Sequence, residues 1–318
     1  MKCELEHIEI EGLSICIPNT DNGKALNEQT SSDLAFQAAS NILQNREIDV
    51  EKLGGLIFLS STPDYRSPAT AMVLQKRLDL PVDLIAFDVN ISGNAFNQGV
   101  QLGHSVLNSS NSNCVMVLYG ETPSKQMNSD AEQNDIFDYG SAVFLSKSDR
   151  ACKMKLDSFN NTNLLKAIAV EQGGYKNAKP QGVELPYSGL DDPGVLHIDL
   201  NKVRDFQIEA MRSFSIYNKL NNSGSHLISN FAPKLIAKDL SKEIAEPLTH
   251  IGYRGAALQI QLQEIIENSE QKKLEIISLS YGEGLSASCL SFQISTNSYT
   301  SFIKSNLIFD EGSVSHEI

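Results

Sequence analysis

The sequence predicts an α/β protein with largely buried sheets. Strand-like and helix-like segments alternate along the first half of the chain, and a similar alternation returns in the second half. Most strand-like segments are short apolar runs, which are typical of strands covered on both faces. Since the two halves are of similar size, we divide the chain into residues 1–150 and 151–318 and expect an internal duplication.

Most of the predicted elements lie in the first half. Apolar residues three and four positions apart predict its helices, and apolar runs or loose alternation predict its strands. Ser31 or Ser32 is the expected N-cap of the first helix. The predicted strands are His7–Ile17, Leu56–Ser60, Asp83–Val89, Cys114–Tyr119 and Ser141–Ser146. The predicted helices are Ser31–Asn45, a segment opening at Pro68, and Ala95–Leu107.

The second half carries fewer clear signals. Its predicted helices are Lys202–Tyr217, Lys234–Ile244 and Gly255–Asn268. One strand is predicted at Leu274–Ser280, directly before a glycine-rich turn. The stretch Gln172–Gly194 is rich in Gly, Pro and Lys, so we interpret it as an irregular connection between the halves.

Length and composition exclude several classes of protein. The chain has 318 residues, of which 41% are hydrophobic and 20% charged, so wholesale disorder is excluded. Its longest apolar runs, such as Cys114–Tyr119, are far shorter than the roughly 20 residues that span a bilayer. Residues 1–6, MKCELE, are acidic where a signal peptide would be apolar. We therefore expect a cytoplasmic protein without a membrane partner.

The charge balance is acidic. There are 39 Asp and Glu against 26 Lys and Arg, with a formal net charge of -13 and a pI near 4.9. This argues against nucleic acid as a partner and, more weakly, against anionic partners such as acyl carrier protein, unless a local basic patch overrides the average. The five cysteines are widely spaced and form no CxxC, so neither a disulfide framework nor a metal site is expected.

Several segments resemble, in order, the β-ketoacyl-acyl-carrier-protein synthase III (FabH-like) family. The clearest are Ser61–Ala71, with the sequence STPDYRSPATA, and Ala86–Val89, with the sequence AFDV. Together the matching segments cover most of the chain. The resemblance implies a thiolase-like five-layer αβαβα fold built from two duplicated halves, and a dimer that extends the sheet across its interface. The further matches are Ser32–Ala35, Asn201–Val203 with Phe206, and Tyr281–Leu285.

The family's chemistry implies a Cys nucleophile at a helix N-terminus, where backbone amides form an oxyanion hole, together with a His and an Asn. On the matching segments, the Cys position falls on Gly93, the His position on Ser229 and the Asn position on Tyr253. The family also stacks coenzyme A on a Trp, but this chain has no Trp and joins its first strand to the next helix through Pro18–Gln29. The resemblance thus predicts a degenerate member without a cofactor.

We therefore expect a non-catalytic subunit of a heteromeric FabH-like condensing or acyl-transferring enzyme, in fatty-acid-derived or secondary-metabolite biosynthesis. It resembles the silent subunit of the heterodimeric alkylquinolone synthase. The expected partner is a catalytically intact FabH-like paralogue, in a heterodimer or a dimer of heterodimers, which handles the acyl thioester. Ser67 stands at the family position that reaches into the partner's acyl pocket, and Phe96 is expected at the interface.

The alternative is a stand-alone acyltransferase with rebuilt chemistry. It would use Ser92 as the nucleophile or a pocket histidine such as His250. Against this, Ser92 is also a good cap for the helix that follows. His226 is expected to be structural, and His104 is expected on the polar side of its helix, where it belongs to no motif. A stretch of four acids is expected to be a solvated loop and not a metal site. These acids are Asp130, Glu132, Asp135 and Asp138.

Overall fold

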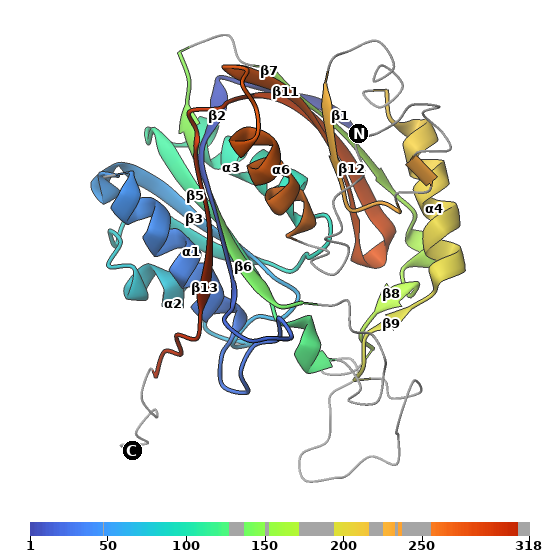
Figure 1. Ribbon diagram of the computed structural model, residues 1–318, viewed down its shortest axis with the longest axis horizontal. Coiled ribbons are helices and arrows are strands. Elements are labelled where there is room, and N and C mark those ends of the chain that lie inside the picture. The colour runs from blue at the N-terminus through green and yellow to red at the C-terminus, as the bar shows by residue number, and fades with distance from the viewer. Residues whose placement is uncertain are drawn as a thin grey trace.

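A six-stranded and a five-stranded sheet face each other across helices α3 (Ala95–Ser109) and α6 (Ala257–Glu267) (Figure 1). Helices α1 (Ser31–Asn45) and α2 (Thr70–Arg77) cover the outer face of the larger sheet, and α4 (Leu200–Ser213) covers that of the smaller one. The layers follow the expected order αβαβα. This computed structural model describes residues 1–46, 48–126, 137–149, 153–171, 194–215, 225–232, 235–236 and 256–310.

The larger sheet has the strand order β13-β2-β6-β5-β3-β4. Strands β3, β4 and β5 are mutually parallel, β13 is parallel to β2, and β6 is antiparallel to both of its neighbours. Strands β3 and β5 are buried throughout, which explains their uninterrupted apolar sequences. In sheet order the strands are Tyr299–Ser305, Ile8–Pro18, Tyr139–Lys147, Cys114–Glu121, Leu53–Leu59 and Ile85–Val89.

The smaller sheet has the order β1-β7-β12-β11-β10, in which only β10 and β11 pair in parallel. Beside it, β8 and β9 form a two-stranded sheet. In sheet order the five strands are Lys2–Glu6, Lys153–Asn160, Ser286–Ser295, Lys273–Gly282 and His226–Ser229. The short elements are β8 (Ile168–Ala169), β9 (His197–Ile198), η1 (Val50–Lys52), η2 (Pro123–Gln126), η3 (Thr162–Leu164) and η8 (Glu283–Leu285).

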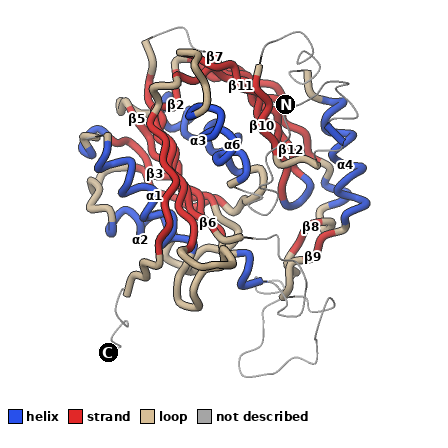
Figure 2. The backbone as a smooth tube through the Cα atoms, in the orientation of Figure 1, coloured by secondary structure: helices blue, strands red, loops and turns tan. Residues whose placement is uncertain are grey.

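The two ends of the chain cross between the sheets. Strand β1 lies in the smaller sheet, which otherwise comes from the second half, and β13 lies in the larger sheet, which otherwise comes from the first half. Figure 2 shows the two sheets on either side of α3 and α6. Each half therefore completes the other's sheet, while the division at residue 150 stays a prediction.

Several predicted elements differ from the structure. Helix α1 begins at Ser31, but its N-cap is Thr30, so the expectation of Ser31 or Ser32 is wrong. The Asp33 carboxylate accepts a hydrogen bond from the Thr30 N–H (2.8 Å), which is half of a capping box. Strands β1, β7, β12 and β13 were not predicted. Helix Lys234–Ile244 and the connection Gln172–Gly194 lie almost entirely outside the described residues.

The layer between the sheets is an apolar core to which α3, α6 and strands of both sheets contribute. Phe96 is fully buried there, with ring centroids 6.5 Å from Tyr119 of β5 and 6.3 Å from Phe292 of β12. The expectation that Phe96 lies at a subunit interface is therefore wrong, because this chain's own two sheets enclose the ring. No helix among the described residues is long and apolar enough to cross a membrane.

The two clearest motifs of the sequence meet at Asp88 of β4. Its carboxylate accepts the backbone N–H of Thr70 (2.6 Å) and that of Ala71 (2.7 Å) at the N-terminus of α2. An acidic side chain at this end of a helix satisfies free amides and complements the helix dipole. Strand β4 and the loop that leads into α2 are thereby fixed to each other.

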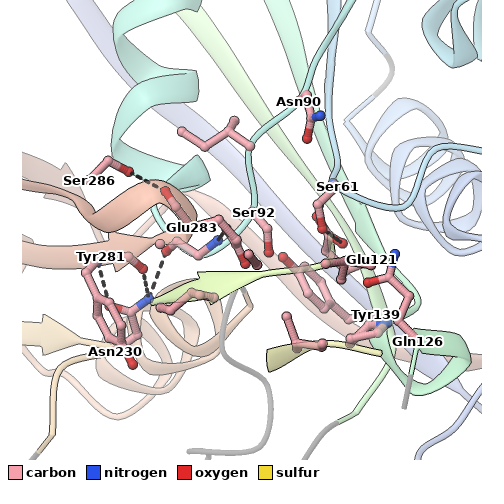
Figure 3. Close-up of a pocket in the computed structure, with 18 of the residues that line it drawn as sticks. Ser61, Asn90, Ser92, Glu121, Gln126, Tyr139, Asn230, Tyr281, Glu283 and Ser286 are labelled. Atoms are coloured by element: carbon pink, nitrogen blue, oxygen red, sulfur yellow. Dashed lines mark hydrogen bonds between the residues drawn. The ribbon is translucent and has the colours of Figure 1, made fainter. Parts of the chain in front are cut away.

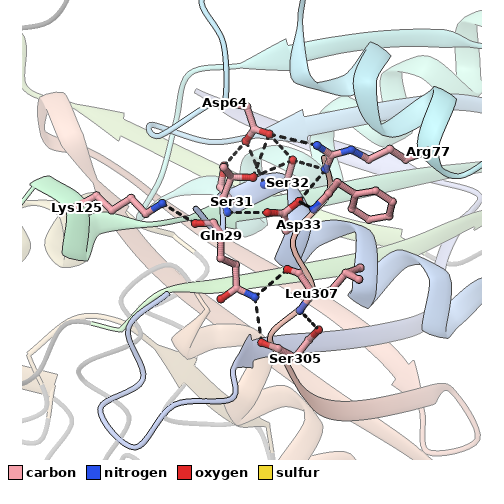
Figure 4. Close-up of polar contacts among 11 residues, drawn as sticks. Gln29, Ser31, Ser32, Asp33, Asp64, Arg77, Lys125, Ser305 and Leu307 are labelled. Carbon is pink, nitrogen blue, oxygen red and sulfur yellow. Dashed lines mark hydrogen bonds and ion pairs between the residues drawn. The ribbon is translucent and has the colours of Figure 1, made fainter. Parts of the chain in front are cut away.

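A buried ion-pair network joins α1, α2 and the loop after β3 (Figure 4). The Arg77 guanidinium contacts the carboxylates of Asp33 (3.1 Å) and Asp64 (3.8 Å), and none of the three side chains is more than 6% exposed. Ser32 accepts from Arg77 Nη1 (2.7 Å) and donates to Asp64. The ring of Phe309 covers the guanidinium at 4.6 Å. The segment after β13, which contains Phe309, therefore covers this network from solvent.

The segment before α1 is held by the same C-terminal segment. The Gln29 amide donates to the carbonyl oxygens of Ser305 (3.0 Å) and Leu307 (3.2 Å) (Figure 4). Lys125 Nζ in turn donates to the carbonyls of Gln29 (2.6 Å) and Asn27 (2.9 Å). The short connection between β2 and α1 is thus stabilised by groups of the protein itself.

Replacing Arg77 by Met should destabilise the fold, because it leaves Asp33 and Asp64 buried without their cation. Breaking a buried ion pair costs about 3–5 kcal/mol, and we expect urea denaturation of Arg77→Met to show a loss in this range. Arg46→Met is the matched control, since it removes a part-exposed pair with Glu11 (3.6 Å) and should cost less than about 1 kcal/mol. Equal losses for the two variants would contradict this role of the network.

Candidate functional site

A cavity of about 500 Å³ lies where the carboxyl ends of β3, β4 and β5 approach the smaller sheet (Figure 3). Ligand sites of α/β folds are commonly found at this end of parallel strands. The polar side chains on the larger-sheet side are Ser61, Asn90, Ser92, Glu121, Gln126 and Tyr139. Those on the opposite side are Asn230, Tyr281, Glu283 and Ser286.

The turn between β4 and α3 contains Gly93 and is bound to the second half of the chain. Asn230, directly after β10, donates its amide to the carbonyls of Gly93 (2.8 Å) and Tyr281 (3.0 Å). The N–H of Tyr281 donates back to Asn230 Oδ1 (3.0 Å). One side chain therefore holds together the β4–α3 turn, β10 and β11 (Figure 3).

Gly93 lies so close to β11 that any side chain at this position would force the backbone to shift. A Cβ at this position would lie 2.4 Å from the carbonyl oxygen of Tyr281 and 3.0 Å from Cα of Gly282. Both are backbone atoms, which cannot rotate away as a flexible side chain would. The Gly93 N–H is also occupied, because it donates to Glu283 Oε2 (3.2 Å). Gly93 thus offers neither a nucleophilic side chain nor a free backbone amide.

A buried polar seam, formed by Asn94 and Asn97 with serines of β11 and β12, continues this contact along α3. Asn97 Nδ2 donates to Ser280 Oγ (2.9 Å), and Ser278 Oγ donates to Asn97 Oδ1 (2.7 Å). Asn94 Oδ1 accepts from the hydroxyls of Ser280 (2.6 Å) and Ser288 (2.5 Å). Because these buried polar groups satisfy one another, the start of α3 is fixed in register against β11 and β12.

Glu121 at the end of β5 is a buried carboxyl group in the cavity wall. It accepts from the Ser61 N–H (2.6 Å), the Ser61 hydroxyl (2.8 Å) and the Thr62 hydroxyl (3.1 Å). Burial, and secondarily the nearby Glu283 carboxylate, raise the pKa of Glu121 to about 8. At neutral pH this group is therefore mostly protonated, and it titrates close to physiological pH.

The expected site residues are only partly brought together. Ser92 lines the cavity and is 9% exposed. Its predicted role as a helix cap is wrong, since α3 begins at Ala95 with Asn94 as its N-cap. Ser229 is buried outside the cavity wall and donates its hydroxyl to the Leu279 carbonyl (3.0 Å).

The other expected residues that the structure describes lie away from the cavity. Ser67 is exposed on the loop between β3 and α2. His104 lies on α3, with its ring 3.2 Å from the Glu6 carbonyl, which fits a structural role. Tyr253 and His250 lie outside the described residues.

The expected acidic loop is not uniformly solvated. Asp138 is fully buried, and its carboxylate accepts from the backbone N–H groups of Ala25 (2.6 Å) and Ser124 (3.0 Å). Its three expected companions, at positions 130, 132 and 135, lie outside the part of the chain that the structure describes. Within that part, no group of His, Cys, Asp and Glu side chains is arranged to hold a metal ion.

Curated proteins of similar sequence include several named β-ketoacyl-[acyl-carrier-protein] synthase III. The protein of Clostridium perfringens (strain 13 / Type A) is 26% identical over 278 residues, which are 81% of this chain and 83% of the relative. The protein of Neisseria gonorrhoeae (strain NCCP11945) is 31% identical over 194 residues, which are 58% of each chain. No protein-family model matches the chain.

Solved structures match almost the whole chain. The 3-oxoacyl-(acyl-carrier protein) synthase of Burkholderia xenovorans LB400 has a TM-score of 0.82 at 19% identity and covers 96% of this chain and 99% of its own. OleA of Xanthomonas campestris has a TM-score of 0.71 at 18% identity, with 92% and 99% covered. The chain has the thiolase-like fold of FabH-like proteins. The predicted fold class is thus confirmed, and the sequence relatives support the FabH-like family.

Adding a single methyl group at Gly93 should be costly. Gly93→Ala forces the β4–α3 turn away from Tyr281 and Gly282, and overpacking of this kind typically costs about 1–3 kcal/mol. We expect a loss of that size in urea denaturation. Gly12→Ala on β2 is the control, because a Cβ there meets its nearest neighbours at an ordinary 3.6–3.7 Å and should leave stability within about 1 kcal/mol. Equal stability of both variants would show that Gly93 does not pack against β11 too closely for a Cβ.

Proposed function

We propose that the chain is a non-catalytic subunit of a heteromeric FabH-like condensing or acyl-transferring enzyme in fatty-acid-derived or secondary-metabolite biosynthesis. The observation that carries the proposal is the closure at Gly93, where a Cβ would meet backbone oxygen at 2.4 Å. The family's nucleophile position thus has neither a reactive side chain nor room for one. Glu283 also takes the Gly93 amide, which a developing oxyanion would need. Acyl chemistry therefore belongs to a catalytically intact FabH-like paralogue.

The free edge of the larger sheet supports an interface with such a paralogue. Strand β4 is last in the sheet order and pairs only with β3 among the described residues. Large apolar side chains near this edge are exposed, with Met72 at 54%, Val82 at 96% and Ile85 at 44%. An open edge strand with apolar neighbours favours addition of another strand. A partner's sheet joined at β4 would bury these side chains.

Ser67 lies on the loop that leads from β3 towards this edge. It is exposed. Asp64 fixes one part of this loop through its ion pair with Arg77, and the loop's end is fixed where Thr70 of α2 donates its N–H to Asp88 of β4. Because the loop is fixed and the Ser67 side chain is small, this residue could border a partner's pocket without filling it. We extend the proposal to say that this chain leaves its partner's acyl pocket wide at this point.

Co-expression with a catalytically intact FabH-like paralogue from the same genome, and purification through a tag on that paralogue, tests the proposal. We expect a stoichiometric complex in which acyl-coenzyme A acylates the partner only, as seen by intact-mass spectrometry. Ile85→Asp places a charge at the β4 edge and should abolish co-purification. Leu165→Asp is the matched control, because Leu165 is a similarly exposed apolar residue (57%) away from this edge.

An acyl adduct on Ser92 of this chain would instead favour the stand-alone acyltransferase. The cavity position of Ser92 is the observation in favour of that second function. Among the described lining residues, however, no imidazole is available as its base. Gly93→Cys should likewise gain no adduct, since its side chain has no space beside Tyr281.

Ser67→Phe tests whether this chain shapes the partner's pocket. We expect the complex to remain intact and the partner's turnover to shift towards shorter acyl chains, because a ring would narrow the pocket. The measurement is partner turnover across a series of acyl chain lengths, with size-exclusion chromatography of each complex. Asn297→Phe, at the exposed turn beside the opposite edge of the sheet, is the control. An unchanged profile in an intact complex would reduce the role to that of a scaffold.

A further inference from the structure

The cavity retains an acidic polar wall although its nucleophile position is closed. Its charged lining side chains within the described residues are the carboxyl groups of Glu121 and Glu283, and no Lys, Arg or His lines it there. The neighbouring cation Lys125 donates to the carbonyls of Asn27 and Gln29 outside the cavity wall. Two carboxyl groups in one cavity, with no cation facing them among the described residues, disfavour anionic ligands.

The rest of the wall suits a small organic group. Apolar side chains from several elements line the cavity, and its volume of about 500 Å³ is in the range of small-molecule sites. Ser92, a residue that is 9% exposed, lines the cavity, and its hydroxyl makes no hydrogen bond within the described residues, so it is available to a ligand. The apolar lining includes Ile91, Phe137, Ile168, Val170 and Leu196.

We propose that this cavity binds an organic monoamine, held as its ammonium ion by Glu121 and Glu283, with its alkyl or aryl group against the apolar wall. Ser61 and Thr62 fix the Glu121 carboxyl through three hydrogen bonds. A carboxylate offers about four acceptor sites, so one remains for the ligand. The proposal concerns the cavity alone and holds whether or not the chain has a catalytic partner.

Amine binding should be linked to proton release. The titratable groups in the wall around Glu121 are Glu283 of η8, Tyr139 of β6 and Tyr281 of β11. Because Glu121 has a pKa of about 8, it carries a proton at neutral pH, and a bound ammonium ion favours its charged form. Affinity should therefore rise as the pH increases towards 8 and level off above it.

Calorimetric titration of the full chain, or of its complex where a partner co-purifies, tests this with hexylamine, 1-hexanol and hexanoate. We expect hexylamine to bind about tenfold more tightly at pH 8.5 than at pH 6.5, 1-hexanol to bind weakly at either pH, and hexanoate not to bind. Binding at pH 6.5 should also release protons, seen as a buffer-dependent heat.

Glu121→Gln should weaken hexylamine binding about tenfold at pH 8.5 and remove its pH dependence, whereas Glu270→Gln on an exposed turn should change neither. Glu283→Gln provides a second variant if Glu121→Gln does not fold, and it should weaken hexylamine binding as well. Hexanoate binding as tightly as hexylamine, or equal hexylamine affinity in the native chain and both cavity variants, would overturn the proposal.

Discussion

The structure depends on the close contact between the Gly93 turn and β11, which Asn230 holds. The contact needs glycine on both sides. A Cβ on Gly93 would lie 2.4 Å from the Tyr281 carbonyl oxygen, and a Cβ on Gly282 would lie 2.6 Å from the Asn94 nitrogen. Asn230 then supplies hydrogen bonds to backbone groups that the contact removes from water. Backbone thus packs directly on backbone where the two halves meet, and this arrangement leaves no volume for a side chain at the first of these glycines.

The contact does more than leave the turn without a nucleophilic side chain, because it also fills the space beside the turn. A site that had merely lost its nucleophile would keep a gap at the turn and a free amide. Here Glu283 occupies the Gly93 amide, and the Asn94 and Asn97 side chains continue a satisfied polar seam with the serines of β11 and β12. The turn is therefore a packed structural joint between the halves, while the cavity beside it remains open and polar.

Local patterns predicted the first half well and the site poorly. Helix α1 and strands β3 and β5 follow from apolar spacing, since each packs mainly against elements of its own half. Strands β12, with the sequence SASCLSFQIS, and β13, with YTSFIKS, were missed. Serines in both strands and one lysine in β13 interrupt the apolar pattern by which a strand is recognised. Glu121 could have been suspected as an acid that ends a buried apolar strand. Asn230 could not, because its function depends on contacts with Gly93, 137 residues away, and with Tyr281.

The loop after β3 connects the cavity to the proposed interface. Ser61 and Thr62 bond the Glu121 carboxyl, the Thr62 carbonyl accepts from Ser31 at the start of α1, and Ser67 lies a few residues further along. A buried carboxyl group is costly to keep unless something compensates its desolvation. The hydrogen bonds from this loop compensate part of that cost, and a cationic ligand would compensate more. Since the same loop holds Ser67, the hydrogen bonds that fix the Glu121 carboxyl also fix the start of the loop that borders the proposed interface.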